Sequence, residues 1–233
     1  MISRCLANLI LKAEIILLYI LSKTTTTYKG LKFGDFEIRG FKKILPSKPF
    51  IIEIGANDGS TTREFLTIFP ESVIECYEPD KRAILNFRKQ NFPENVTLIE
   101  AAVSDYVGYA LLNESSKKDT EWSYSSSISA PKFHKITHPS IYFHRTSKVN
   151  CTTLDKVIDS RKVDLLWMDT QGLEYLILKG TKMTNLNRID FIYLEHNVFG
   201  LYRDSKPLKE ISKLLPNHYI MQLNQNDVLF AKI

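Results

Sequence analysis

Short apolar runs and amphipathic stretches alternate along the chain from residue 50 onwards. This alternation is typical of α/β folds, in which helices connect the strands of a buried parallel sheet. The apolar runs predict five strands, at residues 50–54, 72–77, 96–100, 164–169 and 189–194. Their β-branched residues and few polar interruptions favour strands that are covered on both faces. Two further runs, at 218–223 and 228–233, predict a C-terminal antiparallel hairpin.

Residues 113–148 interrupt this pattern, because they are polar, rich in serine and histidine, and without a clear period. A connection of that length without regular structure is uncommon in a compact domain and is usually functional. We therefore expect residues 50–233 to form one domain, in which 113–148 is an irregular insertion or lid.

Residues 1–23 have apolar positions at helical spacing with charged residues among them. Lys12 and Glu14 interrupt the run of roughly 20 apolar residues that a transmembrane helix needs. We expect an amphipathic helix that packs on the domain or lies on a membrane surface, where the basic segment up to residue 48 would assist. Residues 1–49 are thus interpreted as an N-terminal helix and basic linker.

Composition and charge narrow the class of protein. A chain of 233 residues with 44% hydrophobic content can fill the core of one α/β domain. Three widely spaced cysteines without metal-ligand spacing indicate reduced thiols and a cytoplasmic protein. Residues 1–50 hold nine Lys/Arg against three Asp/Glu, which leaves 22 against 23 in the remainder. This neutral domain argues against nucleic acid as a partner, because phosphate binding needs a basic surface.

The turn after the first predicted strand carries the first candidate chemistry. Gly55 and Gly59 can take positive φ angles and let a ligand approach the backbone. Asn57 stands where the dinucleotide fingerprint has its second glycine, which disfavours a pyrophosphate. A cofactor with an adenosine and an amino-acid group but no phosphate fits better beside Glu53, Asn57 and Asp58. S-adenosylmethionine is such a cofactor.

Two neighbouring features extend the predicted cofactor site. Thr61 and Glu64 form a possible capping box, which would direct the free N–H groups of a helix start toward the loop. Glu78-Pro79 ends the second strand, 23 positions after Gly55, where a carboxylate can accept hydrogen bonds from both hydroxyls of an adenosine ribose.

The small residues 101–105 follow the third strand and would leave room for a flat adenine ring beside Ala102. Ser104 and Asp105 are polar and would hydrogen-bond that ring, or would form a simple turn. Ser104 is thus a candidate contact with the cofactor.

Polar residues also follow the fourth and fifth strands. Asp169, Gln171 and Glu174 come after the fourth strand, and Glu195 and His196 after the fifth. Ligands of open parallel sheets lie outside the carboxyl ends of the strands, so these residues are expected on the acceptor side of the cofactor. Asp169 is expected to contact the cofactor as well. Asp169 or His196 is the candidate general base for an acceptor hydroxyl.

Ser127 and His134, within the insertion, are further candidates for contact with the substrate. His134 and His138 are four residues apart, which on a helix places both rings on one face. No HExxH pattern or cysteine pair completes a zinc site, so metal binding there is not favoured.

Several of these motifs, in this order, resemble the FkbM family of S-adenosylmethionine-dependent methyltransferases. The resemblance covers roughly residues 50–233 and rests on Glu53–Thr62, Tyr77–Asp80, Ala101–Asp105, Thr152–Asp155, and Asp164–Glu174 with Leu178–Gly180. It implies a class I, Rossmann-like methyltransferase fold with a seven-stranded, mostly parallel sheet. It also implies O-methylation of a hydroxyl on a sugar, glycan or related small molecule. The segment 125–134 is similar to an insertion found in a subset of the family.

One position departs from the family pattern. Many members have Asp-x-Glu-Gly after the fourth strand, whereas this chain has Asp169-Thr-Gln171-Gly. The missing charge weakens a divalent-metal hypothesis, although Asp169 and Glu195 together still offer oxygen ligands for a hard cation. Two alternatives to a methyltransferase remain: a nicotinamide-dependent oxidoreductase, which shares the sheet and the ribose-binding acid, and a non-catalytic carbohydrate-binding domain on the same fold.

Overall fold

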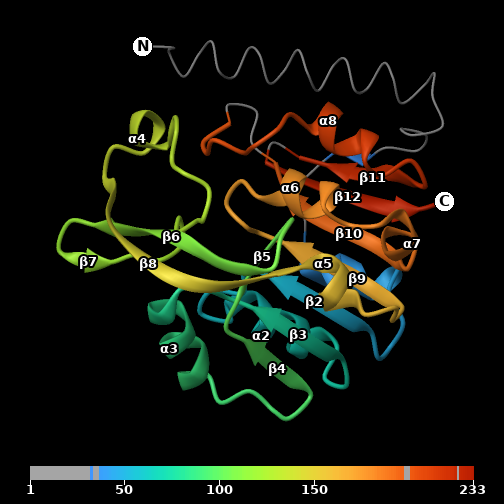
Figure 1. Cartoon of the computed structure of the whole chain (residues 1–233). Coiled ribbons are helices and arrows are strands. Elements are labelled where there is room, and N and C mark those ends of the chain that lie inside the picture. The colour runs from blue at the N-terminus through green and yellow to red at the C-terminus, as the bar shows by residue number, and fades with distance from the viewer. Residues whose placement is uncertain (1–31, 34–36, 197–199, 225) are drawn as a thin grey trace.

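A twisted eight-stranded sheet forms the centre of the computed structural model, which describes residues 32–33, 37–196, 200–224 and 226–233 (Figure 1). The strand order is β1-β11-β12-β10-β9-β2-β3-β4. The strands are β1 (Lys32–Phe33), β2 (Phe50–Ile54), β3 (Val73–Tyr77), β4 (Val96–Ile99), β9 (Val163–Met168), β10 (Ile189–Glu195), β11 (His218–Leu223) and β12 (Asp227–Lys232).

Strand direction in this sheet agrees with the expected methyltransferase architecture. The strands β2, β3, β4, β9 and β10 pair in parallel, and β12 is antiparallel to both β10 and β11. The two-residue strand β1 adds an eighth strand, parallel to the edge strand β11. The seven strands and the C-terminal hairpin predicted from the sequence are therefore confirmed.

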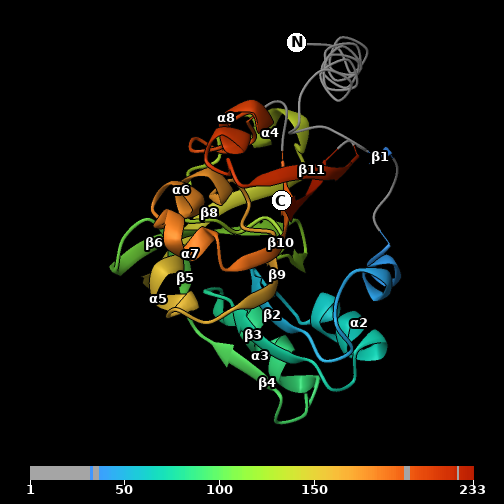
Figure 2. The ribbon, with the colours of Figure 1, turned by 90° about the vertical axis from the view of Figure 1, so that its right-hand side faces the viewer.

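Helices cover both faces of the sheet (Figure 2). On one face, η2 (Ile38–Lys43), α2 (Ser60–Ile68) and α3 (Lys81–Lys89) contribute Phe41, Phe65 and Phe87 to a core cluster. On the other face lie α5 (Leu154–Ile158), α6 (Glu174–Lys179), α7 (Met183–Leu186) and α8 (Leu208–Lys213). Burial on both faces explains why the central strands are almost continuously apolar.

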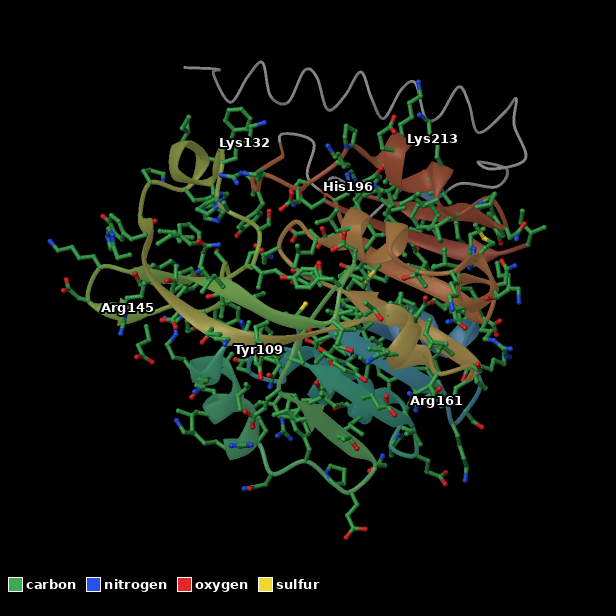
Figure 3. All side chains as sticks on the ribbon, viewed as in Figure 1. Tyr109, Lys132, Arg145, Arg161, His196 and Lys213 are labelled. Carbon is green, nitrogen blue, oxygen red and sulfur yellow. The ribbon has the colours of Figure 1, made fainter. Side chains whose placement is uncertain are left out.

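A second, four-stranded sheet extends from one side of the domain as an arm, with Arg145 exposed on its outer part (Figure 3). Its order is β5-β8-β6-β7. The arm consists of β5 (Ala102–Ser104), β6 (Gly108–Lys117), β7 (Thr120–Glu121) and β8 (Ile141–Thr153), with α4 (His134–Thr137) before β8.

The expectation of irregular structure was therefore wrong for 113–117 and 141–148, whereas 122–133 contains no helix and no strand. That this insertion acts as a lid stays a prediction. The ladder between β6 and β8 is held by backbone hydrogen bonds, and most of its residues are exposed or half-buried. Such strands need little apolar alternation, so the polar sequence did not reveal them. A small cluster that includes Leu112, Val149 and Cys151 gives the ladder an apolar underside near the main sheet.

The helix after the loop of residues 55–59 begins two residues earlier than the proposed capping box requires. Gly59 is the N-cap of α2, with a left-handed φ of 82°, and Asp58 Oδ1 accepts from the backbone N–H of Ser60 at 3.1 Å. The capping box of Thr61 and Glu64 is thus not formed.

The expected helix at residues 1–23 lies outside the described residues, so its packing and any membrane contact stay predictions. Within the described ranges, no helix is long and apolar enough to cross a bilayer.

Candidate active site

Gly55 determines how the two central strands end. Its φ is 86°, and a Cβ added here would lie 1.9 Å from the carbonyl oxygen of Asp169. Only glycine permits this conformation and this close approach together. The ends of β2 and β9 are thereby brought into contact, which places Asp169 directly beside the loop after β2.

A pocket opens at these strand ends. Six of the expected cofactor residues line it: Gly55, Asn57, Glu78, Pro79, Ala102 and Asp169. Residues that the sequence reasoning did not single out also line it: Ile54, Tyr77, Ala101, Val103, Leu112, Ser123, Tyr124, Ser126, Ile128, Thr170 and Leu173. Ser127 and Gln171, expected to face the substrate, lie in the same pocket.

Glu78 is one of the two acidic residues that line this pocket. Its two carboxylate oxygens accept from the backbone N–H groups of Asn57 at 2.9 Å and Asp80 at 2.8 Å. The side chain is only 5% exposed, and this burial raises the pKa of Glu78 to about 7. Each oxygen keeps lone-pair capacity toward the pocket. The geometry fits the expected contact with two ribose hydroxyls.

A segment of the arm lies across the pocket. Ser123 Oγ donates to Asn57 Oδ1 at 3.2 Å, and Tyr124 OH donates to Asp58 Oδ2 at 2.7 Å. We call residues 123–128 the arm segment. It leaves about 70 Å³ of free volume, below the roughly 300–1,000 Å³ of most ligand pockets. The arm segment therefore forms one wall of the pocket.

Five other expected cofactor residues do not line the pocket: Glu53, Asp58, Gly59, Thr61 and Ser104. Asp58 supports the pocket indirectly, because it holds both Ser60 and Tyr124. Gly59 is needed for packing, since a Cβ there would lie 2.6 Å from the ring of Phe92. Ser104 is 1% exposed and bonds to Asp105.

Glu53 lies beneath α2, where its Oε2 accepts from Thr62 Oγ1 at 2.6 Å. Burial raises the pKa of Glu53 to about 7. A carboxyl whose pKa is higher in the folded state stabilises the fold only while it is protonated. Its contribution is complete below the unfolded pKa near 4.5 and is lost as pH rises through about 7.

Glu53→Gln is therefore expected to flatten the pH dependence of stability, because an uncharged amide does not ionise. The free energy of unfolding of the wild type should fall between pH 5 and pH 8, and the variant should lose less, by on the order of 3 kcal/mol. Urea unfolding at both pH values measures this difference. Glu94→Gln, at an exposed position, is the control. Equal slopes for all three proteins would contradict the prediction.

Asp169 and Glu195 meet at the neighbouring ends of β9 and β10, and Gln171 joins them. Gln171 Nε2 donates to Asp169 Oδ1 at 2.7 Å and to Glu195 Oε2 at 3.0 Å. Gln171 adopts a left-handed φ of 56°, which turns its side chain back toward these carboxyls. The amide of Gln171 thus donates a hydrogen bond to each of the two carboxyls, whereas a glutamate at this position would have added a third negative charge.

The two carboxyls differ in their protonation. Asp169 is exposed toward the pocket and Glu195 is half-buried, but the surrounding protein raises the pKa of both through loss of solvation. The charge of Asp169 adds to the rise in the pKa of Glu195, whereas the hydrogen bonds of Gln171 and Glu195 favour ionised Asp169. Glu195 accordingly holds a proton more readily, and Asp169 is the stronger candidate for an ionised base.

Tyr202, which the sequence did not indicate, connects this cluster to the arm segment. Its hydroxyl lies 2.7 Å from the carbonyl oxygen of Ser125 and 3.0 Å from Gln171 Oε1. Its side chain is 3% exposed. The arm segment and the turn that carries Asp169 are therefore coupled through one buried phenol.

Glu174 supports this turn and does not reach the pocket. Its Oε1 accepts from Thr170 N at 3.0 Å and from Thr170 Oγ1 at 2.7 Å. The predicted contact of Glu174 with the substrate gains no support from this geometry, because its carboxylate is 5% exposed and already occupied.

His196 does not line the pocket that Asp169 lines. It borders a small hollow with Tyr202 and with Ile211 of α8, and it lies near α8 in Figure 3. Burial lowers the pKa of His196 to about 4, so the ring is neutral at pH 7. His134 packs in the arm against Tyr202, with ring centroids 5.5 Å apart. Among the described residues, His196 Nε2 and His134 Nδ1 are buried without a hydrogen-bond partner.

Metal binding gains no support from the clustering of side chains. Within the part of the chain that the structure describes, no group of three or more His, Cys, Asp or Glu side chains is arranged to hold a metal ion.

The sheet order, the buried acid at the end of β3 and the pocket at the strand ends together define a Rossmann-like, class I methyltransferase fold. Residues 53–224 match the model of the methyltransferase FkbM domain. The chain belongs to this family and is a methyltransferase. The family implies S-adenosylmethionine as the methyl donor. The match decides against a nicotinamide-dependent oxidoreductase and against a non-catalytic binding domain.

Two known proteins illustrate the relationship. The chain is 36% identical over 175 residues to the 2-O-methyltransferase NoeI of Sinorhizobium fredii (strain NBRC 101917 / NGR234), which covers 72% of each protein. The crystal structure of methyltransferase FkbM from Methylobacillus flagellatus KT matches 81% of this chain with a TM-score of 0.53 and 13% identity. The chain spans 45% of the length of that structure, and the likeness shows the fold.

Proposed function

We propose that the protein transfers a methyl group from S-adenosylmethionine to a hydroxyl of a sugar or glycan. The observation that carries this proposal is the carboxyl of Asp169, which lies in the cofactor pocket and is held by Gln171. The 2-O-methyltransferase relative supports oxygen as the methyl acceptor.

The residues of the pocket would bind and orient the two reactants. Glu78 would accept the ribose hydroxyls, and Ala101 and Ala102 would leave room for the adenine. When bound, S-adenosylmethionine supplies an electrophilic methyl group on a sulfonium. Holding the acceptor oxygen in line with that group provides most of the acceleration in such a displacement.

Asp169 would remove the proton of the acceptor hydroxyl. A hydroxyl is a poor nucleophile until its proton is taken, and a carboxylate within hydrogen-bond distance can take it. Gln171 and protonated Glu195 hold the Asp169 carboxylate in place and favour its ionised form. His196 is the alternative base, but it borders a separate hollow that meets the pocket only at Gln171.

Calorimetry with S-adenosylhomocysteine and with NAD tests the cofactor assignment. We expect S-adenosylhomocysteine to bind and NAD not to bind, because Asn57 stands where a dinucleotide loop has the glycine that lets a pyrophosphate approach the backbone. Methyl transfer to a panel of mono- and oligosaccharides, followed by mass spectrometry, then tests the acceptor class. Tight NAD binding, or methylation of phenols or amines in preference to sugars, would contradict the proposal.

A further inference from the structure

A groove is lined by residues of η2 and α2 and by residues of β9, β10 and the β11–β12 hairpin. Figure 2 shows η2 and α2 on this face of the sheet. Its free volume is about 920 Å³. The residues used below that line it are Arg39, Glu64, Trp167, Tyr193, Asn224 and Asp227. We call it the aromatic groove. The cofactor pocket, with about 70 Å³ of free volume, has no comparable space for an acceptor.

The groove is positioned by strand alternation. Trp167 and Tyr193 are register partners on β9 and β10, and their rings stack with centroids 3.5 Å apart. Side chains two residues apart on a strand point to the same face. Asp169 lies just past the end of β9 and Glu195 ends β10, each two residues and about 7 Å beyond the stacked rings. Asp169 itself does not line the groove, but it lies close enough to Tyr193 and Asp227, which do, for their electrostatic interactions to shift pKa values.

The polar lining of the groove is open to a ligand. Arg39 and Glu64 are exposed, and neither forms a side-chain hydrogen bond or ion pair with any residue in the described ranges. Asp227 lies beside Tyr193, and its charge adds to burial in raising the pKa of the phenol. Asn224 Nδ2 donates to Asp227 Oδ2 at 2.9 Å, which fixes that side of the groove.

The chemistry of the lining selects among acceptor classes. Glu37, Glu64 and Asp227 provide three carboxylates against the single guanidinium of Arg39, so the groove disfavours anionic ligands such as nucleic acids. Sugar hydroxyls both donate and accept hydrogen bonds, and sugar C–H faces are apolar. A site that combines aromatic rings with carboxylate, amide and guanidinium groups meets all of these needs.

We propose that the aromatic groove binds the carbohydrate acceptor, a neutral oligosaccharide whose terminal or internal hydroxyl reaches Asp169. This inference rests on the proposed function and adds the location and the chemical class of the acceptor. Arg39 and Glu64 determine acceptor binding and take no part in cofactor binding or in the proton transfer.

The test uses the full chain saturated with S-adenosylhomocysteine and a glycan array of neutral and anionic oligosaccharides. Each glycan that binds on the array is then titrated into the Trp122→Phe variant, in which Trp167 is the one remaining tryptophan. We expect neutral glycans to bind and to change the fluorescence of Trp167. Arg39→Ala and Glu64→Ala should each weaken glycan binding by roughly tenfold, because each substitution removes one charged hydrogen bond to the glycan.

Matched controls separate this proposal from the cofactor assignment. Lys42→Ala on η2 and Glu71→Ala after α2 remove exposed charges that lie outside the groove and should leave glycan affinity unchanged. All four alanine variants should bind S-adenosylhomocysteine as the wild type does. Absence of glycan binding, or binding that Arg39→Ala and Glu64→Ala do not weaken, overturns the groove assignment. If the wild type does not bind S-adenosylhomocysteine, the proposed function is overturned. Glycan binding that Arg39→Ala and Glu64→Ala weaken would still support the groove assignment.

Discussion

Replacing Asp169 with asparagine is expected to lower turnover by about 10²-fold to 10⁴-fold, the range that a positioned general base contributes. Asparagine keeps the size of the side chain but cannot accept a proton. The backbone contact between Asp169 and Gly55 is unchanged by the substitution, so cofactor affinity should stay close to that of the wild type. Turnover is measured by methyl transfer to the acceptor, and affinity by calorimetry with S-adenosylhomocysteine.

The pH profile makes this prediction sharper. Because burial raises the pKa of Asp169, the acidic limb of the wild-type profile should lie above the usual range of an aspartate. Activity should rise with pH as this carboxyl ionises, and the variant should lose that limb along with its activity.

His196→Ala is the matched comparison for Asp169→Asn, because His196 is the other base proposed from the sequence. We expect His196→Ala to retain most of its turnover, since its ring faces the hollow near α8 and not the cofactor pocket. Normal turnover of Asp169→Asn together with an inactive His196→Ala would move the base to His196.

The sequence predicted the main sheet well because its strands are buried on both faces. β2 and β9 are apolar over most of their length, so their location and end points follow from the pattern of hydrophobic residues. The turns after β2 and β3 were recognised for a physical reason as well. Glycine at position 55 permits the positive φ that the turn needs, and the acid at position 78 ends its strand at the pocket, where a ligand hydroxyl is expected.

The arm and its contacts were not predictable in the same way. β6 and β8 are solvent-exposed over much of their length, so their pairing leaves little trace in hydrophobic periodicity. Tyr202 reaches Ser125 and Gln171 across 77 and 31 residues of sequence, and no local pattern announces such a contact. The serine-rich composition of residues 123–129 was the available signal, and it indicated function without indicating partners.

The aromatic groove shows the same limit. Trp167 and Tyr193 read as core residues in the sequence, and both are less than 10% exposed. Their stacking in the groove depends on the register of β9 with β10, which pairs them across the two strands. Strand register is a long-range property, and it cannot be read from either strand alone.

Replacing Glu78 with glutamine is expected to weaken S-adenosylhomocysteine binding by tenfold or more. Glutamine keeps the shape but loses the charge-assisted hydrogen bonds to two ribose hydroxyls, each contributing roughly 1.5 to 3 kcal/mol. Its amide nitrogen also faces a backbone N–H, of Asn57 or of Asp80, where the carboxylate had an acceptor oxygen. Glu75→Gln is the control, because it lies on the same strand and pairs with Arg161 away from the pocket.

The wild-type affinity should itself depend on pH. The pKa of Glu78 is raised to about 7, and the ionised form accepts the ribose hydroxyls more strongly. Binding should therefore tighten as pH rises from 5.5 to 8, and Glu78→Gln should lose that part of the pH dependence. Calorimetry at several pH values, with thermal unfolding to confirm that each variant is folded, measures both effects. If Glu78→Gln is folded and binds S-adenosylhomocysteine as tightly as the wild type at pH 8, then Glu78 does not hold the ribose, and the cofactor must lie elsewhere along the sheet edge.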